Sequence, residues 1–339
     1  MLFQSTRLMG ALFLVAAALT AQAGQLTAYS SASADTLKLY ADQFAKSHPN
    51  IKVNWVRDST GIMQARLMAE KDNPRADVVF GHTAANLVLL GQAGMLAPYA
   101  PKGVDKLNAL FQEKRSPPNW VGMYGWASAI CFNTIEAKKG NVPKPVKWAD
   151  LTQPVYKGKV TMPNPASSGT GLMMVNAWIQ MWGEEKAWAF MDKLHENIAS
   201  YSHSGDKPCE QAGGGEYVVG LSFPLRAAKV KTAGAPIDII IAEEGTGWDM
   251  QASGIMKNTK NMDDAKVLMD WAISSEAMEL YGQNYEVTAL PVKVAKLEHV
   301  PANIADKMIK VDFNWIAKEQ ARVVAEWRKR YDAKSEPKK

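Results

Sequence analysis

Three segments of this chain share one pattern: a short apolar run, a turn rich in serine, threonine and glycine, and then a run with helical spacing of apolar residues. The clearest turn is residues 163–171, which lies between the apolar stretches 159–162 and 172–182. Ser168 or Thr170 is placed to cap the first turn of the helix that follows. Such a turn directs free N–H groups and the positive end of a helix dipole at one point, so it predicts an anion-binding site.

The other two copies of the pattern stand near the start of the chain. Residues 26–29 suit a strand, and the serine-rich segment 30–35 separates them from a predicted helix. Residues 53–56 form the next predicted strand, followed by residues 58–61 and a second helix. Strands that alternate with helices favour an α/β fold with mostly parallel sheets flanked by helices. The ligand crevice of such sheets lies beyond the carboxyl ends of the strands, where we expect the three turns to meet.

The first 23 residues have the pattern of a secretory signal peptide. Arg7 precedes an apolar run over residues 8–19, and Ala21-Gln22-Ala23 provides a small-x-small cleavage site. The apolar run is too short to span a membrane. We therefore expect a mature chain that begins near Gly24, is not inserted in a membrane and lies in the periplasm.

The net charge of +5 is a small excess, and basic and acidic residues are interleaved up to Arg328. This distribution excludes a nucleic-acid footprint, and the polar tail at the end is predicted to be disordered. An oxidising compartment would allow Cys131 and Cys209 to form a disulfide, but two cysteines alone do not define a disulfide framework. The sequence leaves their pairing open.

Motifs for catalysis or cofactor binding are weak. Ser204 and Lys207 have S-x-x-K spacing, but the companion motifs of that enzyme class are missing. There is no Walker loop and no G-x-G-x-x-G, and the five histidines stand singly. We predict a protein that is not an enzyme and has no cofactor and no metal. A secreted serine hydrolase using Ser204 and Lys207 is the alternative from another class.

Four segments together resemble a known family: Tyr29-Ser30-Ser31 and residues 77–80, 163–171 and 247–261. They are similar to the ferric-ion-binding-protein-related class of periplasmic binding proteins of ABC importers, and within it to the 2-aminoethylphosphonate-binding members. The resemblance covers essentially the whole mature chain. It implies a type II binding protein with two α/β lobes, joined by two crossing strands, that close on the ligand like a hinged trap. It also implies a monomer that delivers its ligand to a membrane permease and its ATPase.

From the resemblance we expect residues 24–127 and 252–339 to form the first lobe and residues 128–251 the second. The ferric members bind metal through adjacent tyrosines after the strand that corresponds to residues 217–221. This chain has Ser222-Phe223-Pro224 there and no Tyr-Tyr pair. Because ferric ion prefers several anionic oxygens, this departure argues against iron.

An organic phosphonate suits the remaining residues, since its three oxygens need many donors, which neutral hydroxyls and N–H groups supply without burying extra charge. The candidate ligand-binding residues in the turns are Ser30, Ser31, Thr60 and Gly61 of the first lobe and Ser168, Gly169, Thr170 and Ser222 of the second. Four further residues lie at strand ends or crossings where they are expected to line the crevice: His82, Trp126, Phe223 and Tyr285.

The ammonium of 2-aminoethylphosphonate needs a carboxylate or an aromatic face. Asp206 is the first candidate, with Glu244 and Asp249 as alternatives. Other ligands remain open at this point: phosphate, a phosphate ester, a carboxylate, or ferric ion together with an exogenous anion.

Overall fold

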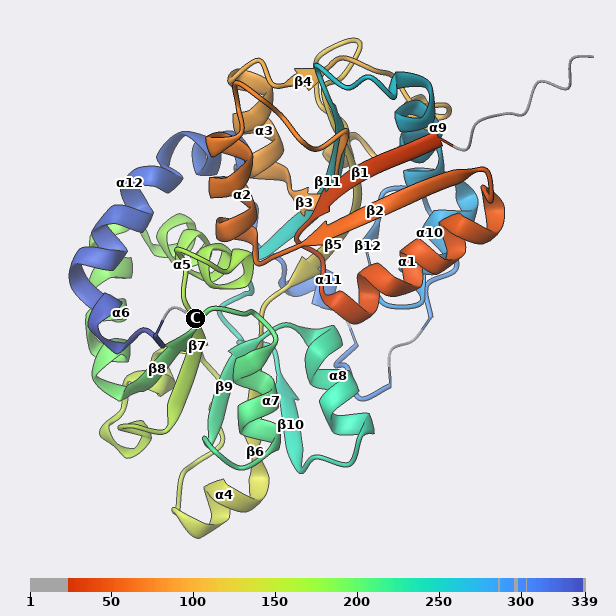
Figure 1. Ribbon diagram of the computed structural model, residues 1–339. Coiled ribbons are helices and arrows are strands. Elements are labelled where there is room, and N and C mark those ends of the chain that lie inside the picture. Colours follow the sequence, from red (N-terminus) through yellow and green to blue (C-terminus); the bar gives the residue numbers. More distant parts are fainter. Residues whose placement is uncertain (1–23, 286, 296–297, 303, 338–339) are drawn as a thin grey trace, which may run out of the picture.

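The computed structural model describes residues 24–285, 287–295, 298–302 and 304–337. The expected signal peptide, residues 1–23, lies outside the described residues. The described chain forms two lobes, each built on one β-sheet with helices around it (Figure 1). The two-lobed α/β architecture is therefore confirmed. Among the described residues, none of the helices combines the length and the apolar composition needed to cross a membrane.

The sheet of the first lobe has the strand order β12-β5-β11-β3-β1-β2, with β4 paired to β11. Its strands are β1 (Gly24–Ser30), β2 (Ile51–Arg57), β3 (Val78–Thr83), β4 (Leu96–Ala97), β5 (Val121–Ala127), β11 (Trp248–Met256) and β12 (Val287–Thr288). The helices of this lobe are α1 (Ala34–Ser47), α2 (Thr60–Ala69), α3 (Ala84–Gln92), α9 (Met262–Ala272) and α10 (Ser275–Gly282).

The sheet of the second lobe has the order β10-β6-β9-β7-β8. Its strands are β6 (Ala129–Asn133), β7 (Val160–Pro163), β8 (Ile198–Ser202), β9 (Val219–Ser222) and β10 (Ile237–Ile240). The helices of this lobe are α4 (Thr134–Lys139), α5 (Gly169–Trp182), α6 (Glu184–Asn197), α7 (Lys207–Gly213) and α8 (Pro224–Thr232). Two last helices, α11 (Ile304–Lys307) and α12 (Phe313–Tyr331), follow the return to the first lobe. In the described part of the chain, short 3₁₀ helices lie at Val104–Lys106, Ala109–Phe111, Trp148–Thr152, Pro154–Tyr156 and Asp332–Lys334.

Both sheets are mixed, whereas the sequence favoured mostly parallel ones. Strand β1 is parallel to β2 and β3, but β11 is antiparallel to β3 and β5. In the second sheet β7 is parallel to β8 and β9, but β6 is antiparallel to β9 and β10. The reason is topological. Strand β5 carries the chain out of the first lobe and β11 carries it back, so the two neighbours run in opposite directions.

The two crossings lie side by side and are bonded to each other. The Ser128 N–H donates to the Gly247 carbonyl (2.9 Å), and Ser128 Oγ lies 2.7 Å from Thr246 Oγ1. A third segment joins them, since the Thr246 N–H donates to the Lys307 carbonyl (2.7 Å). These short crossings are the natural hinge for a rotation of one lobe against the other.

The C-terminal segment packs on both lobes. Ile316 and Ala317 of α12 lie against α3, whereas Val323, Trp327 and Tyr331 lie in the core of the second lobe. The tail that we expected to be disordered is ordered through residue 337, because it pairs with the edge strand β8 in a parallel bridge between Ser335 and Tyr201. The lobe boundaries stay a prediction. Those boundaries assign residues 323–331 to the first lobe, but these residues pack with the second.

Cys131 in β6 and Cys209 in α7 form a disulfide with a sequence separation of 78 residues. It ties α7 to the second sheet. Replacing both cysteines with serine is expected to lower the free energy of unfolding by about 2–4 kcal/mol, because the unfolded chain regains the freedom of the closed loop. Urea titration of the oxidised wild type and the double variant measures this. Equal midpoints would contradict the prediction, and reduced wild type serves as the matched control.

Candidate ligand-binding site between the lobes

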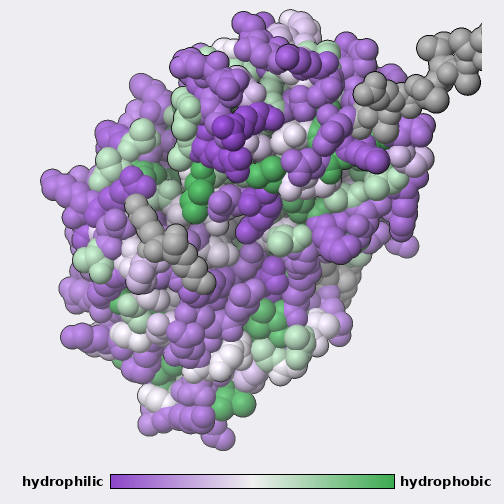
Figure 2. Space-filling model, in the orientation of Figure 1, coloured by the Kyte–Doolittle hydropathy of each residue, from purple (hydrophilic) through white to green (hydrophobic). Residues whose placement is uncertain are grey.

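Figure 1 shows that helices α1, α2 and α5 begin where the two lobes face each other. Residues of both lobes line a hollow at this place. The space among its lining atoms, part of which is open to solvent, is about 510 Å³. Figure 2 shows a mostly hydrophilic face with a recess between its upper and lower halves. The serine and threonine residues that line it are Ser31, Ser33, Ser59 and Thr60 on the first lobe and Ser168 and Thr170 on the second.

Local sequence explains why these hydroxyls face the hollow. Strands β1, β2 and β7 end there, and each is followed by a short polar turn and a helix. Ser168 caps α5 by accepting from the Gly171 N–H at 3.5 Å. Ser33 and Ser59 occupy the N-cap positions of α1 and α2, and neither side chain makes a capping bond in the described chain. The three helix ends therefore supply hydroxyls, N–H groups and positive dipole ends without a formal charge.

The lobes touch each other across this hollow. The Gly61 N–H of the first lobe donates to the Ser167 carbonyl of the second at 2.8 Å. Glycine is needed here, because a Cβ on Gly61 would lie 2.2 Å from the Ala166 carbonyl oxygen. A Cβ on Gly169 would likewise lie 2.7 Å from Thr60 Oγ1. At this point the contact between the lobes thus has no room for a side chain at either glycine.

The carboxylate in the hollow is already paired. Ser33 Oγ donates to both oxygens of Asp206, at 3.0 and 3.1 Å, and Arg226 Nε donates at 2.8 Å. Arg226 also contacts Asp35 of the first lobe, so these charges bridge the lobes. Arg57 lines the hollow, whereas Arg226 does not, and Arg57 Nε donates to the Ala32 carbonyl (2.9 Å). The hollow therefore favours an anion over a cation.

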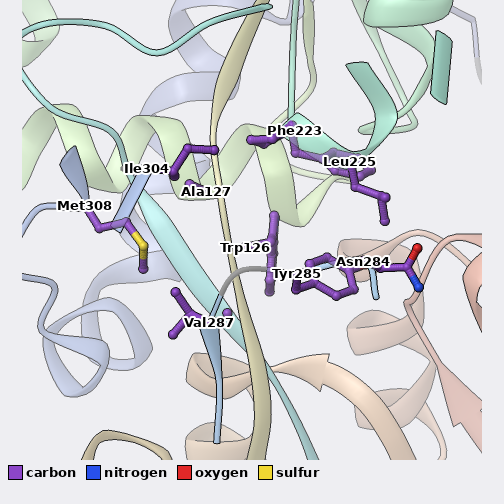
Figure 3. A pocket seen from close by; sticks show the side chains of 11 residues that line it. Trp126, Ala127, Phe223, Leu225, Asn284, Tyr285, Val287, Ile304 and Met308 are labelled. Carbon is purple, nitrogen blue, oxygen red and sulfur yellow. The ribbon is translucent and has the colours of Figure 1, made fainter. Parts of the chain in front are cut away.

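One wall of the hollow is aromatic and continues into a second pocket, in which the space among the lining atoms, part of it open to solvent, is about 380 Å³. Trp126, Phe223 and Tyr285 line both. Figure 3 shows Trp126 between Phe223 and Val287, with Tyr285 beside it. The other labelled side chains around this cavity, Ala127, Leu225, Asn284, Ile304 and Met308, are apolar except for Asn284. We call it the apolar annex.

Gln251 is a lining residue that sequence analysis missed. Its side chain is 8% exposed, and its Oε1 is buried without a hydrogen-bond partner among the described residues. An unpaired buried polar atom costs about 1–3 kcal/mol, so such an atom beside a hollow is suited to a ligand contact. The signal in the sequence was a glutamine inside the apolar run 248–256.

The structure brings most of the predicted site residues to the hollow: Ser31, Thr60, Ser168, Gly169, Thr170, Asp206, Phe223 and Tyr285, together with Trp126. Four others are not among the residues that line it: Ser30, Gly61, His82 and Ser222. Ser222 Oγ donates to the Gly205 carbonyl (2.7 Å), and Ser30 Oγ accepts from the Ala32 N–H (3.2 Å). Besides Gln251, the analysis also missed Ser33, Ser59 and Arg57.

His82 contacts Ser31, one of the residues that line the hollow. Its Nδ1 lies 2.8 Å from Ser31 Oγ, and its Nε2 lies 3.2 Å from Asn86 Nδ2 and 3.3 Å from Gln64 Oε1. Burial lowers the pKa of His82 to about 3, so the imidazole is neutral at physiological pH. The ring therefore fixes the Ser31 hydroxyl without adding charge.

Asp249, an alternative candidate for the ammonium, is not among the residues that line the hollow. Burial raises its pKa from the ordinary 3.8 to about 7, partly offset by the Met250 and Ala84 N–H groups. The folded state thus holds this proton more tightly than the unfolded state. The stability this provides is complete below pH of about 4 and is lost as the pH rises to about 7.

Replacing Asp249 with asparagine is expected to remove that loss. The free energy of unfolding of the wild type should fall between pH of about 4 and 7, by at most about 1.4 kcal/mol per pH unit. The variant should show a flatter profile in urea titrations at the same pH values. Parallel profiles for the two proteins would contradict the assignment.

Comparison with known proteins agrees with this geometry. A family model described as bacterial extracellular solute-binding protein matches residues 73–318. An "Uncharacterized protein" of Haemophilus influenzae is 33% identical, over 81% of this chain and 80% of its own. A "Probable ABC transporter periplasmic-binding protein" of Sinorhizobium fredii is 27% identical, over 84% and 80%. A "Putative 2-aminoethylphosphonate-binding periplasmic protein" of Salmonella typhimurium is 24% identical, over 70% and 68%.

Solved structures show the same fold. The periplasmic binding protein AfuA from Actinobacillus pleuropneumoniae, with exogenous fructose-6-phosphate bound, superposes with a TM-score of 0.83 at 30% identity, over 91% of this chain and 99% of its own. Iron-bound HitA from Pseudomonas aeruginosa superposes with a TM-score of 0.74 at 19% identity, over 89% and 99%, a likeness of fold alone. The described residues of this chain hold no group of three or more His, Cys, Asp or Glu side chains placed for a metal ion.

Proposed function

Because this chain belongs to the family of bacterial extracellular solute-binding proteins, we propose that it captures a small organic phosphonate or phosphate ester in the periplasm and delivers it to an ABC permease and its ATPase. The observation that carries the proposal is the convergence of hydroxyls and helix N-termini from both lobes on one hollow. A phosphoryl group has three oxygens that accept several hydrogen bonds each, which matches this surplus of donors. Closure of the lobes completes the donor set.

The apolar annex favours an organic ligand over inorganic phosphate. Phosphate would occupy the hydroxyl-lined part of the hollow and leave the aromatic wall in contact with water. A ligand with carbon atoms next to its phosphorus group would cover Trp126, Phe223 and Tyr285, and each buried methylene contributes about 0.8 kcal/mol. The organic ligand should therefore bind more tightly.

Within this class, 2-aminoethylphosphonate is the ligand that the sequence favours, and the Salmonella relative named for it supports the choice. Its ethylene group would lie on the aromatic wall, and its ammonium would contact an aromatic face or share Asp206 with Arg226. The existing pair between Asp206 and Arg226 makes the aromatic face the better partner.

A phosphorylated sugar is the second candidate. AfuA is more similar in sequence and was solved with fructose-6-phosphate. Sugar hydroxyls would also suit Gln251, whose buried Oε1 lacks a donor in the described chain. The two candidates differ in what they present beyond the phosphorus group, which is an ammonium in one and several hydroxyls in the other.

Thermal unfolding of the protein from residue 24 onward, with a panel of ligands, tests the proposal. A ligand present at 100 times its Kd stabilises the folded state by about 2.7 kcal/mol, which raises the unfolding midpoint. We expect a clear rise with 2-aminoethylphosphonate or fructose 6-phosphate and a smaller rise with inorganic phosphate. A rise with ferric citrate alone would overturn the proposal.

A further inference from the structure

The C-terminal helix and the tail after it reach both lobes next to the ligand hollow. In Figure 1 helix α12 runs from the first lobe to the second, and the 3₁₀ helix Asp332–Lys334 that follows it contacts β8. Ile316 and Ala317 pack with Ala85 of α3, and Trp327 and Tyr331 pack in the core of the second lobe. This one segment is therefore in contact with elements that carry both halves of the site.

In the second lobe, the tail fixes the turn that carries Ser168. Asn164 Nδ2 donates to Ser335 Oγ (2.8 Å) and to Asp332 Oδ1 (3.3 Å). The same amide accepts from the Ala166 N–H through its Oδ1 at 2.7 Å, and the Asn164 carbonyl accepts from the Ser168 N–H at 2.8 Å. Because the tail fixes the nitrogen end of this amide, its oxygen end is oriented toward the turn.

The tail also holds the next turn of the same lobe. Glu336 Oε1 accepts from the His203 N–H at 2.6 Å, and its other oxygen forms an ion pair with Lys207 Nζ. The Glu336 N–H donates to the Tyr201 carbonyl at 2.9 Å. Glu336 thus clamps both ends of the segment 203–207, whose Gly205 and Asp206 line the hollow.

In the first lobe, a chain of hydrogen bonds leads from α12 to the site. Gln320 Nε2 donates to Asn86 Oδ1 (2.9 Å), and Asn86 Nδ2 lies 3.2 Å from His82 Nε2. His82 Nδ1 in turn lies 2.8 Å from Ser31 Oγ, which lines the hollow. The side chains of Gln320, Asn86 and His82 are thereby placed to set the position of this hydroxyl.

We propose that residues 313–336 act as a brace that positions the anion-binding groups of both lobes, through Gln320 on one side and Asp332, Ser335 and Glu336 on the other. The inference rests on the proposed function only for what the positioned groups bind. Glu336 is a positioning residue, since it acts on the hollow through the backbone of 203–207. Loss of the brace should loosen that segment and weaken ligand binding while the core of the second lobe stays folded.

Hydrogen exchange of the protein from residue 24 onward tests the brace without any ligand. In Glu336→Ala, backbone amides of 203–207 should exchange roughly tenfold faster, the change expected when one hydrogen bond to a charged group is lost. Glu326→Ala is the matched control, because Glu326 pairs with Arg330 on the same helix (2.6 Å) and, among the described residues, makes no hydrogen bond or ion pair with that segment. Equal exchange in the two variants would overturn the proposal.

Glu336→Gln separates the two bonds that the Glu336 side chain makes, one to the His203 N–H and one to Lys207. An amide oxygen still accepts from the His203 N–H, but it carries no charge to pair with Lys207. The exchange rate of 203–207 in this variant should therefore lie between that of the wild type and that of Glu336→Ala. Calorimetric titration with 2-aminoethylphosphonate and fructose 6-phosphate adds a second readout, in which Glu336→Ala should raise Kd roughly tenfold, Glu336→Gln less, and Glu326→Ala not at all. Wild-type Kd in Glu336→Ala would refute positioning. If neither compound binds the wild type, the proposed function fails, while the exchange result still decides the brace.

Discussion

Replacing Gly61 with alanine is expected to lower ligand affinity at least roughly 100-fold, about 2.8 kcal/mol, without lowering the stability of the unliganded protein. The added Cβ would lie 2.2 Å from the Ala166 carbonyl oxygen and 2.9 Å from the Ser167 Cα. Both atoms belong to the opposite lobe, so the clash exists only in the closed state. Backbone on both sides leaves little room for it to relax.

We expect the Gly61→Ala change not to lower the stability of the open protein. Gly61 lies in the first turn of α2 and is not among the glycines with positive φ. Alanine is favoured over glycine in a helix by about 1 kcal/mol. The unliganded variant should therefore unfold at the same temperature as the wild type or slightly above it. A variant that is at least as stable as the wild type but binds ligand more weakly is what we expect when only the closing of the lobes is blocked.

Gly91→Ala is the matched control. Gly91 lies in α3 of the same lobe, and a Cβ there would have its nearest contact with Asn119 Nδ2, at 3.4 Å. It gains the same helix propensity without touching the second lobe. Calorimetry with the best ligand of the wild type and thermal unfolding give both quantities. Wild-type affinity in Gly61→Ala would show that capture does not need this closed contact.

The double replacement Ser168→Ala, Thr170→Ala is the second change with a large expected effect. Both hydroxyls line the hollow at the start of α5. A hydrogen bond to a charged group contributes about 1.5–3 kcal/mol, so the loss of two should weaken binding of a phosphonate or phosphate ester at least 100-fold. The fold should remain, because α5 is otherwise anchored by its buried side chains, including Met174, Val175 and Trp178.

Loss of the helix cap needs its own control. Ser274 caps α10 by accepting from the Ala277 N–H at 3.2 Å, in the part of the first lobe away from the hollow. Ser274→Ala should cost stability of about 1 kcal/mol, as for Ser168, but leave affinity unchanged. If the double variant binds as tightly as the control, the anion site does not lie at the start of α5.

Local sequence was sufficient for features that depend on neighbours along the chain. The cap at Ser168 and the turns after β1 and β2 were predictable, because each rests on residues within a few positions of one another. The helices α7 and α8 were missed. Each is short, carries a proline in its first turn and has few apolar residues, so neither gave a clear helical period.

Contacts between distant residues were out of reach. Ser33 and Asp206 are 173 positions apart, and the pairing of Asp206 with Arg226 decides whether a free carboxylate exists. From the sequence, Gln251 is only a residue of a predicted strand. Its place beside the hollow is visible only in the structure. The polar tail lacks any local reason to be ordered, and its partners lie on β8 and in the turn of Asn164.

The most direct test of phosphoryl capture is calorimetric titration of the protein from residue 24 onward with paired ligands. One pair is 2-aminoethylphosphonate and ethylamine, and the other is fructose 6-phosphate and fructose. The account predicts that at least one phosphorus compound binds and that its partner without phosphorus does not, since the hydroxyls and helix ends from the two lobes recognise the anion. Absence of binding by both phosphorus compounds, or equal binding within a pair, would contradict it.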